Sequence, residues 1–216
     1  MKQTQDLLLM ICLGKIAKNK VFPYVINKYN NKEYLKNVIY TTICDLAIVY
    51  KVVIEESEEG LASITVTTEM LKNWGITIQE LHETAIRNNN SKEPEFVEME
   101  DMLMSLMSGS EIDNLYLSQN VDLENKEGMY TLRNAETCGS AVLLNTFALN
   151  RVSDILESDL IIIPSSIHEV IVIRVEKFHE ERINDLIIDI NKSECEDEEV
   201  LSDHLYYYNK KEGLTW

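Results

Sequence analysis

The amino-acid sequence predicts an α+β protein whose antiparallel sheets carry helices packed on one face. Two observations support this fold class. Residues 45–69 contain two strand-like runs joined by a polar turn, and residues 129–209 follow a β-α-β-β-α-β order. Because the period of the hydrophobic pattern is the main signal of secondary structure, these two regions determine the prediction.

The N-terminal α+β region is predicted to span residues 1–95. Its first helix is expected at residues 5–18, where apolar side chains recur at helical spacing. VFPYVIN, residues 21–27, has the composition of a strand, and Pro23 restricts that strand to an edge or to its first residues. A short helix is predicted over residues 31–39.

The hairpin signal at residues 45–69 comes from residue type. DLAIVYKVVI, 45–54, and LASITVTTE, 61–69, are rich in the β-branched and aromatic residues that favour strands. The polar stretch EESEEG separates them. This pattern predicts two antiparallel strands joined by a turn.

Two helices are predicted to follow the hairpin, each with its own capping signal. Thr67 or Thr68 is expected to cap a short helix that ends at Gly75. Thr77 and Glu80 stand at the spacing of a capping box before the second helix.

A methionine-rich helix and an acidic linker are predicted over residues 96–128. The helix, 96–108, carries its apolar side chains on one side: Met99, Met102, Leu103, Leu106 and Met107. Methionine repacks easily, so Met99 and Met102 are candidate partner-binding residues, with ordinary core packing as the alternative. Polar and acidic residues from 108 to 128 predict a linker or long loop.

The C-terminal unit is predicted to span residues 129–216, with a ferredoxin-like arrangement as the simplest candidate. Strands are expected at 129–134, 160–164, 169–175 and 204–209. Helices are expected at 139–157, with an interruption near Asn145, and at 178–190.

Charge is the most unusual property of the chain. The net charge is −17, and residues 53–216 alone hold 12 basic and 34 acidic residues. Phosphate backbones repel such a surface, so direct nucleic-acid binding is disfavoured. Acidic loops that keep the protein soluble are the simplest explanation. The alternative is an acidic surface that binds a basic partner or imitates nucleic acid.

Cofactor and membrane signals are weak in this sequence. No apolar run approaches the roughly 18 to 20 residues needed to cross a bilayer. The four cysteines form no C-x-x-C, which favours reduced thiols in a cytoplasmic protein. The four histidines lack metal-ligand spacing, and no glycine-rich phosphate motif is present. We therefore expect no metal and no cofactor.

A hydrolase site is the main catalytic alternative. Ser165 and His168 lie between two aliphatic runs, while Asp203 and His204 precede the last strand. A serine nucleophile needs an imidazole, an acid that orients it and donors for the oxyanion. The chain has no G-x-S-x-G elbow, and serines beside a proline are typical of turns. A structural turn at Ser165 and His168 is favoured over catalysis. At Asp203 and His204, a cap or turn before the last strand is favoured over catalysis.

Tyrosines in the last strand form a further candidate binding surface. Side chains alternate along a strand, so Tyr206 and Tyr208 share one face and Tyr207 takes the other. One face is expected in the core. The other would present tyrosine, which is favoured at protein interfaces, to a partner, and Tyr206 and Tyr208 are the candidate binding residues.

Six stretches carry a family resemblance: INKYNNKEYL, DLAIVYKVVI, LKNWGITIQELHETAIRN, GSAVLL, IIIPSSIHEVIVI and EVLSDHLYYY. Together they resemble an uncharacterised bacterial family, common in gut clostridia, that is known only as a domain of unknown function. Two of the segments are more distantly similar to the YtpQ-like family. The resemblance runs from about residue 20 to residue 213. It implies a bacterial, cytoplasmic α+β protein and no reaction, because the family has no established catalytic residues.

The functional prediction is a non-enzymatic protein-binding or adaptor protein. It rests on ample core-forming sequence without a convincing catalytic or cofactor motif. The first alternative is an acidic inhibitor or nucleic-acid mimic, of phage or mobile-element type, that binds a basic partner. The second is a hydrolase that uses a Ser/His/Asp site.

Overall fold

The computed structural model describes the chain in two compact units, Met1–Ser91 and Lys92–Trp216. The described residues are 20–57, 60–119, 121, 128–135, 138–164, 166–177, 187 and 199–216. The helix predicted at 5–18 and most of the helix predicted at 178–190 lie outside them. No helix within these residues is long and apolar enough to cross a membrane.

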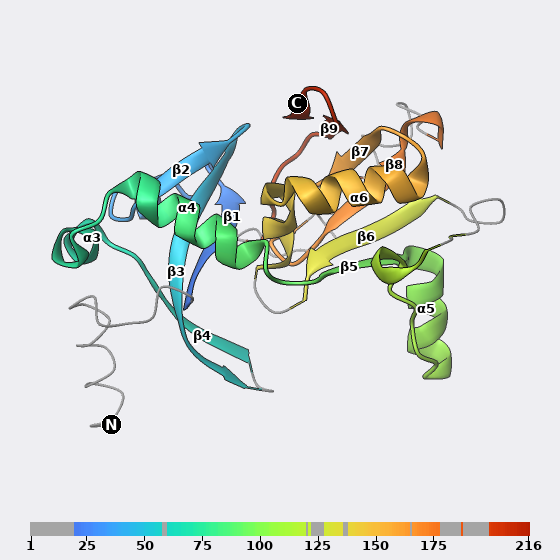
Figure 1. Cartoon of the computed structure of the whole chain (residues 1–216), viewed down its shortest axis with the longest axis horizontal. Helices are drawn as coiled ribbons and strands as arrows, with labels where there is room; N and C mark the ends of the chain where they lie inside the picture. Colours follow the sequence, from blue (N-terminus) through green and yellow to red (C-terminus); the bar gives the residue numbers. More distant parts are fainter. Residues whose placement is uncertain are drawn as a thin grey trace. The chain divides into compact units, whose positions relative to one another are not determined.

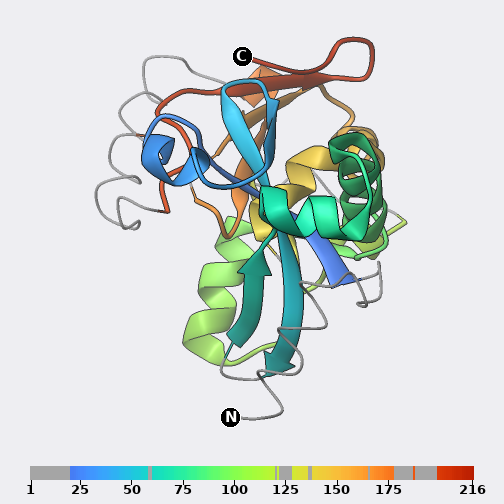
Figure 2. The same ribbon diagram turned by 90° about the vertical axis from the view of Figure 1, so that its left-hand side faces the viewer.

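The first unit contains an antiparallel sheet built around one long strand (Figure 1). Its strands are β1 (Val21–Asn27), β2 (Tyr40–Ile43), β3 (Leu46–Ser57) and β4 (Gly60–Thr65). β3 pairs with β1 along one side, and with β2 and then β4 along the other. The hairpin of β3 and β4 extends from this sheet as a two-stranded ribbon (Figure 2).

The described residues of the first unit also form α2 (Lys32–Leu35), α3 (Thr68–Trp74) and α4 (Ile78–Asn89). The Thr67 hydroxyl accepts the backbone N–H of Met70, and Gly75 ends α3 in the left-handed conformation. Thr77 and Glu80 form the reciprocal capping box that begins α4. The predicted caps are therefore confirmed.

Two predictions for the first unit need correction. The helix expected over 31–39 is only four residues long, because the chain turns after Leu35 and β2 begins at Tyr40. No residue of β2 is buried, so the sequence YTTI carries no apolar run that would have marked this short strand. The hairpin of β3 and β4 is confirmed, but the strands continue into the stretch expected to be its turn.

The second unit contains a six-stranded antiparallel sheet in the order β10-β9-β7-β8-β6-β5. Its strands are β5 (Pro94–Glu98), β6 (Met129–Asn134), β7 (Leu160–Ile163), β8 (Val170–Arg174), β9 (Tyr206–Asn209) and β10 (Gly213–Thr215). The described segments that connect these strands include α5 (Met99–Ser108), α6 (Thr146–Leu156) and the 3-10 turns η2 (Leu115–Leu117), η3 (Gly139–Leu144) and η4 (Val175–Lys177).

Both faces of the central strands in the second unit are buried. The Tyr208 hydroxyl donates to Asn150 Oδ1 at 2.9 Å, which places α6 over the face that carries Tyr208. On the opposite face, Ile161 and Ile173 pack in a cluster with the helical residue Ile187. Burial on both sides explains why β7 and β8 are continuous hydrophobic runs. The prediction that helices cover one face only is therefore wrong.

The strand order also differs from the expected ferredoxin-like arrangement. In that arrangement the first strand lies between the third and the last. Here β6 and β7 do flank β8, but β9 pairs with β7, and β5 takes the place beside β6. The coarser prediction, an α+β protein with antiparallel sheets, is confirmed.

Element boundaries in the second unit depart from the predicted ones at two places. Residues 96–98, expected in the methionine-rich helix, belong to strand β5 because Phe96 and Glu98 are buried against β6. Asn145 interrupts the expected helix as predicted: η3 precedes it, and its side chain accepts the backbone N–H of Ala148 to cap α6.

Candidate functional site

The connection between β7 and β8 carries Ser166 and His168, while Ser165 lies outside the described residues. The backbone N–H of His168 donates to Ser166 Oγ at 3.1 Å. The backbone N–H of Ser166 donates to the Glu169 carbonyl at 3.4 Å. Both bonds are local, and serine hydroxyls make such bonds in turns.

Neighbouring segments fix this connection from two sides. The Ile167 carbonyl accepts the backbone N–H of Ser140 at 3.1 Å, and the Ile167 N–H donates to the Glu199 carbonyl at 3.0 Å. Gly139 lies so close that a Cβ there would stand 1.5 Å from the His168 carbonyl oxygen. The turn is thus a packed structural element of the second unit.

His168 itself is directed toward an acidic residue. Its Nε2 lies 3.0 Å from Glu199 Oε1, and the imidazole is largely exposed. Within the described part of the chain, His168 makes no hydrogen bond to Asp203 or His204. The contact with Glu199 joins the turn to the segment before β9, and the hydrogen bonds of His168 do not include His204.

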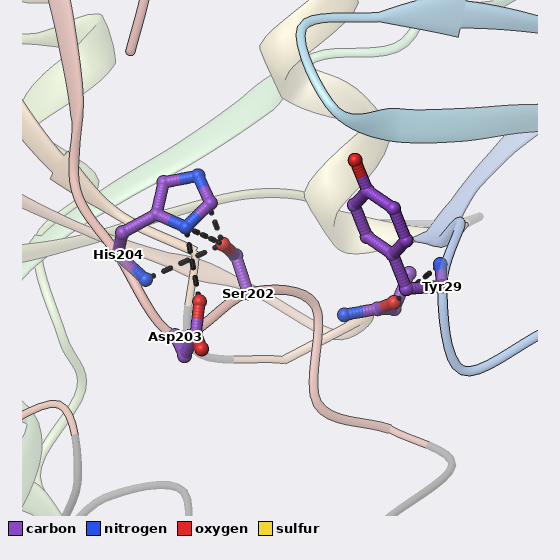
Figure 3. Close-up of polar contacts among 5 residues, drawn as sticks. Tyr29, Ser202, Asp203 and His204 are labelled. Atoms are coloured by element: carbon purple, nitrogen blue, oxygen red, sulfur yellow. Dashed lines mark hydrogen bonds and ion pairs between the residues drawn. The ribbon is translucent and has the colours of Figure 1, made fainter.

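Ser202, Asp203 and His204 do lie together (Figure 3). His204 Nδ1 is 3.0 Å from Asp203 Oδ1 and 3.1 Å from Ser202 Oγ. The Ser202 hydroxyl also accepts the backbone N–H of His204, at 3.4 Å. These contacts span two residues at most, which is typical of a serine-centred turn.

The arrangement of these three side chains differs from a catalytic triad. A triad uses both ring nitrogens: one bonds the serine and the other bonds a buried acid. Here the acid and the serine both approach Nδ1 most closely, and the Asp203 side chain is 92% exposed. His204 also stacks on Trp216, with ring centroids 5.0 Å apart. The cluster is better suited to positioning the start of β9 than to activating a nucleophile.

The tyrosine candidates in β9 face the interior. Tyr206 and Tyr208 are buried on the face covered by α6, whereas Tyr207 on the opposite face is half exposed. The two tyrosines that sequence reasoning singled out therefore contact the core of this unit, and the solvent-facing aromatic is their neighbour.

A further polar cluster lies in the first unit, and sequence reasoning missed it. The hydroxyl of the fully buried Tyr50 in β3 lies 2.8 Å from His82 Nδ1 in α4 and 2.6 Å from Thr41 Oγ1 in β2. Burial lowers the pKa of His82 and raises the pKa of Tyr50. The Tyr50 hydroxyl therefore joins three elements, β2, β3 and α4, through its contacts with Thr41 and His82.

Helix α5 has the most unusual surface in the second unit. No residue of α5 is buried, and Figure 1 shows it extending from the end of β5 away from its sheet. Its large apolar residues are exposed as follows: Leu103 57%, Met104 62%, Leu106 76% and Met107 87%. We call these four residues the α5 face. Such a contiguous exposed apolar surface is a common mark of an interaction site.

The two methionines predicted to bind a partner lie on the inner side of α5. Met99 packs against the isoleucine cluster of the sheet. Met102 is partly buried and lines a cavity of about 300 Å³ beside β5 and β6. The methionine-rich helix therefore divides its apolar side chains between the core and the solvent.

Residue Asn114 protects the edge of the sheet next to this helix. Its side-chain amide donates to the Pro94 carbonyl at 3.0 Å and accepts the backbone N–H of Phe96, also at 3.0 Å. The amide thus occupies the position that a neighbouring strand's peptide group would take on β5. This protection disfavours pairing with a strand from another chain.

In the part of the chain that the structure describes, no group of three or more His, Cys, Asp or Glu side chains is arranged to hold a metal ion.

Comparison with known proteins adds the family. A model described as "Family of unknown function (DUF5688)" matches residues 5–210. The chain belongs to this family. No curated protein and no solved structure matches the chain. The predicted membership of a family without an assigned activity is confirmed, and DUF5688 membership supplies no catalytic residues.

Proposed function

We propose that this DUF5688 protein is a non-enzymatic binding protein that holds a basic, amphipathic segment of another protein on helix α5. The observation that carries this proposal is the exposure of the α5 face on a helix without a buried residue. Amphipathic helices commonly bind partners by laying an apolar face into an apolar groove or surface.

The energetics of the α5 face support an interaction of useful strength. Fully burying a leucine or methionine side chain contributes about 1.5 to 3 kcal/mol. The four residues are already partly covered, so burying their remaining exposed surface contributes roughly 4 to 8 kcal/mol before association costs. Those costs, roughly 4 to 15 kcal/mol, consume much of this gain. Charge attraction would then have to supply part of the affinity.

The charge around α5 favours a basic partner. Residues 93–113 contain seven acidic residues and no basic residue. Glu100 is exposed and lies three residues before Leu103, so it borders the α5 face. The last turn of α5 has no basic residue to offset the negative end of the helix dipole.

The distribution of charge between the units supports the same partner. Residues 1–91 contain ten basic and ten acidic residues, whereas residues 92–216 contain ten basic and 27 acidic residues. The net charge of −17 therefore belongs to the unit that carries α5. A basic segment would be attracted to this unit and oriented on it.

The hydrolase alternative has less support. A serine nucleophile would need to be accessible, but Ser202 is buried and its hydroxyl accepts a backbone N–H. Ser165, the predicted nucleophile, lies outside the described residues. His168 Nε2 contacts Glu199 and not Asp203 or His204, so the predicted residues are not brought together.

A titration with matched variants tests the proposal. The probe is a peptide of leucine and lysine, about 18 residues long, with leucines at positions i, i+3, i+4 and i+7 of a helix. Leu106→Ser with Met107→Ser should weaken binding about tenfold or more, because two exposed anchors are lost. The control is Phe147→Ser, since Phe147 is 75% exposed on α6 of the same unit and should be neutral.

Three outcomes would contradict the proposal. Equal effects of the α5 and Phe147 variants would indicate non-specific apolar contact. Binding that does not weaken as the salt concentration rises would show that the positive charge of the partner does not contribute to recognition. Dimerisation of the protein that is lost in the α5 variant, measured by light scattering, would assign the α5 face to a second copy of the chain.

A further inference from the structure

The cavity beside α5 contains both apolar and charged walls. Its volume is about 300 Å³, at the lower end of the range for ligand pockets. Val97, Met102 and Ile112 supply apolar surface, while Glu95 and Arg133 supply opposite charges. Because Met102 belongs to α5, the cavity adjoins the helix that carries the α5 face.

Arg133 contacts only one of the two carboxylate oxygens of Glu95. Arg133 Nε donates to Glu95 Oε2 at 2.6 Å, and Arg133 Nη2 lies 2.6 Å from the same oxygen. Within the described residues, Glu95 Oε1 accepts no hydrogen bond. A carboxylate can accept several hydrogen bonds, so this oxygen has capacity for an incoming cation.

Thr131 provides a second polar group in the cavity wall. The residue is only 4% exposed, and it lines the cavity on the same face of the sheet as Glu95. Its side chain makes no hydrogen bond within the described part of the chain. A hydroxyl oxygen can accept hydrogen bonds, so a donor that enters the cavity can bind Thr131.

From this geometry we infer that the cavity is an anchor subsite for one basic side chain of the segment that binds α5. The aliphatic stem of a lysine or arginine lies on Val97, Met102 and Ile112. Its charged head meets Glu95 Oε1 and the Thr131 hydroxyl. Basic side chains suit such a site because the stem is apolar while the head is a strong donor.

This inference rests on the proposed function. It adds one subsite that recognises a single basic side chain of the bound segment. The α5 face would supply apolar contact along one side of the segment. The cavity would fix which residue of the segment lies where, because only one basic side chain can occupy it. Such a site gives register and specificity more than affinity.

Two substitutions at the ion pair should act in opposite directions on peptide binding. Glu95→Gln should weaken binding of the leucine–lysine peptide about tenfold, the size expected for one charge-assisted hydrogen bond. Arg133→Gln removes the cation that competes for Glu95 and should tighten binding by about threefold.

Both substitutions break the same ion pair between β5 and β6, so a merely structural role would move binding in one direction for both. Norleucine replacements, one lysine at a time, then locate the anchor. One replacement should weaken binding to the native protein and have no further effect in Glu95→Gln. The inference fails if Glu95→Gln binds like the native protein while the α5 variant binds weakly. The proposed function fails with it if the α5 variant also binds normally.

Discussion

Replacing Gly139 by alanine should strongly destabilise the second unit. The added Cβ would lie 1.5 Å from the His168 carbonyl oxygen and 2.5 Å from its carbonyl carbon. Ordinary contacts between heavy atoms are about 3.5 Å, so one of the two backbone segments must move by about 2 Å.

The magnitude follows from what that movement disrupts. The segment after Gly139 and the β7–β8 connection are joined by the hydrogen bond from Ser140 N–H to the Ile167 carbonyl. The Cys138 thiol donates to the same carbonyl at 3.3 Å. Overpacking costs about 1 to 3 kcal/mol and each lost hydrogen bond about 1 kcal/mol, so we expect a loss of about 3 to 5 kcal/mol.

Thermal unfolding followed by calorimetry measures this loss against a matched control. Gly139→Ala should lower the Tm of the second unit by about 8 to 15 °C. The control is Gly109→Ala. Gly109 is in the same unit at φ +71°, and no atom lies within 4 Å of the Cβ that alanine would add. This substitution should cost only the left-handed strain, about 1 kcal/mol or about 3 °C. Equal Tm values for the two variants would refute the claim that close packing against Gly139 fixes the β7–β8 connection.

Three other predictions follow from the described contacts. Asn114→Ala should cost about 2 kcal/mol and increase aggregation of the second unit, because the edge of β5 loses the side-chain amide that covers it; an unchanged urea midpoint would contradict this. The pKa of His82 is held below its ordinary value of 6.5 by burial, so the unfolded state binds more protons and stability falls as pH drops below about 6.5. Urea midpoints should show this slope in the native protein and a weaker one in His82→Gln. Leu106→Ser with Met107→Ser should change stability by less than about 0.5 kcal/mol, because both side chains are exposed, and a larger loss would show that they belong to the core.

Local sequence signals predicted the helix caps and the central strands well. Thr67, Gly75 and the pair Thr77 and Glu80 act through contacts within four residues, so their role can be read without knowing the rest of the fold. The runs at 160–163 and 170–173 are apolar throughout, because both faces of their sheet are buried.

Long-range pairing could not be predicted in the same way. Phe96 looks like part of a helix because Met99 and Met102 continue its apolar spacing, yet pairing with Leu132 draws it into β5. The position of β9 beside β7, which excludes the expected strand order, depends on contacts across about 45 residues of sequence.

The candidate site was predicted only in part. The methionine-rich helix was recognised from its sequence, but the sequence could not show which of its apolar residues face solvent. Helical spacing placed Met99 and Met102 with Leu106 on one side, whereas packing on the sheet separates them. The cavity could not be foreseen, because Glu95 and Arg133 meet only through the register of β5 with β6.

The central claim is that helix α5 binds a basic amphipathic segment, and methyl NMR tests it most directly. The protein carries eight methionines, which can be labelled at their methyl carbons and followed while the leucine–lysine peptide is added. The account predicts large shifts for Met104 and Met107 on the α5 face, a shift for Met102 at the cavity, and none for Met70, which is buried in the first unit. Unchanged Met104 and Met107 signals at a peptide concentration that saturates binding would contradict it.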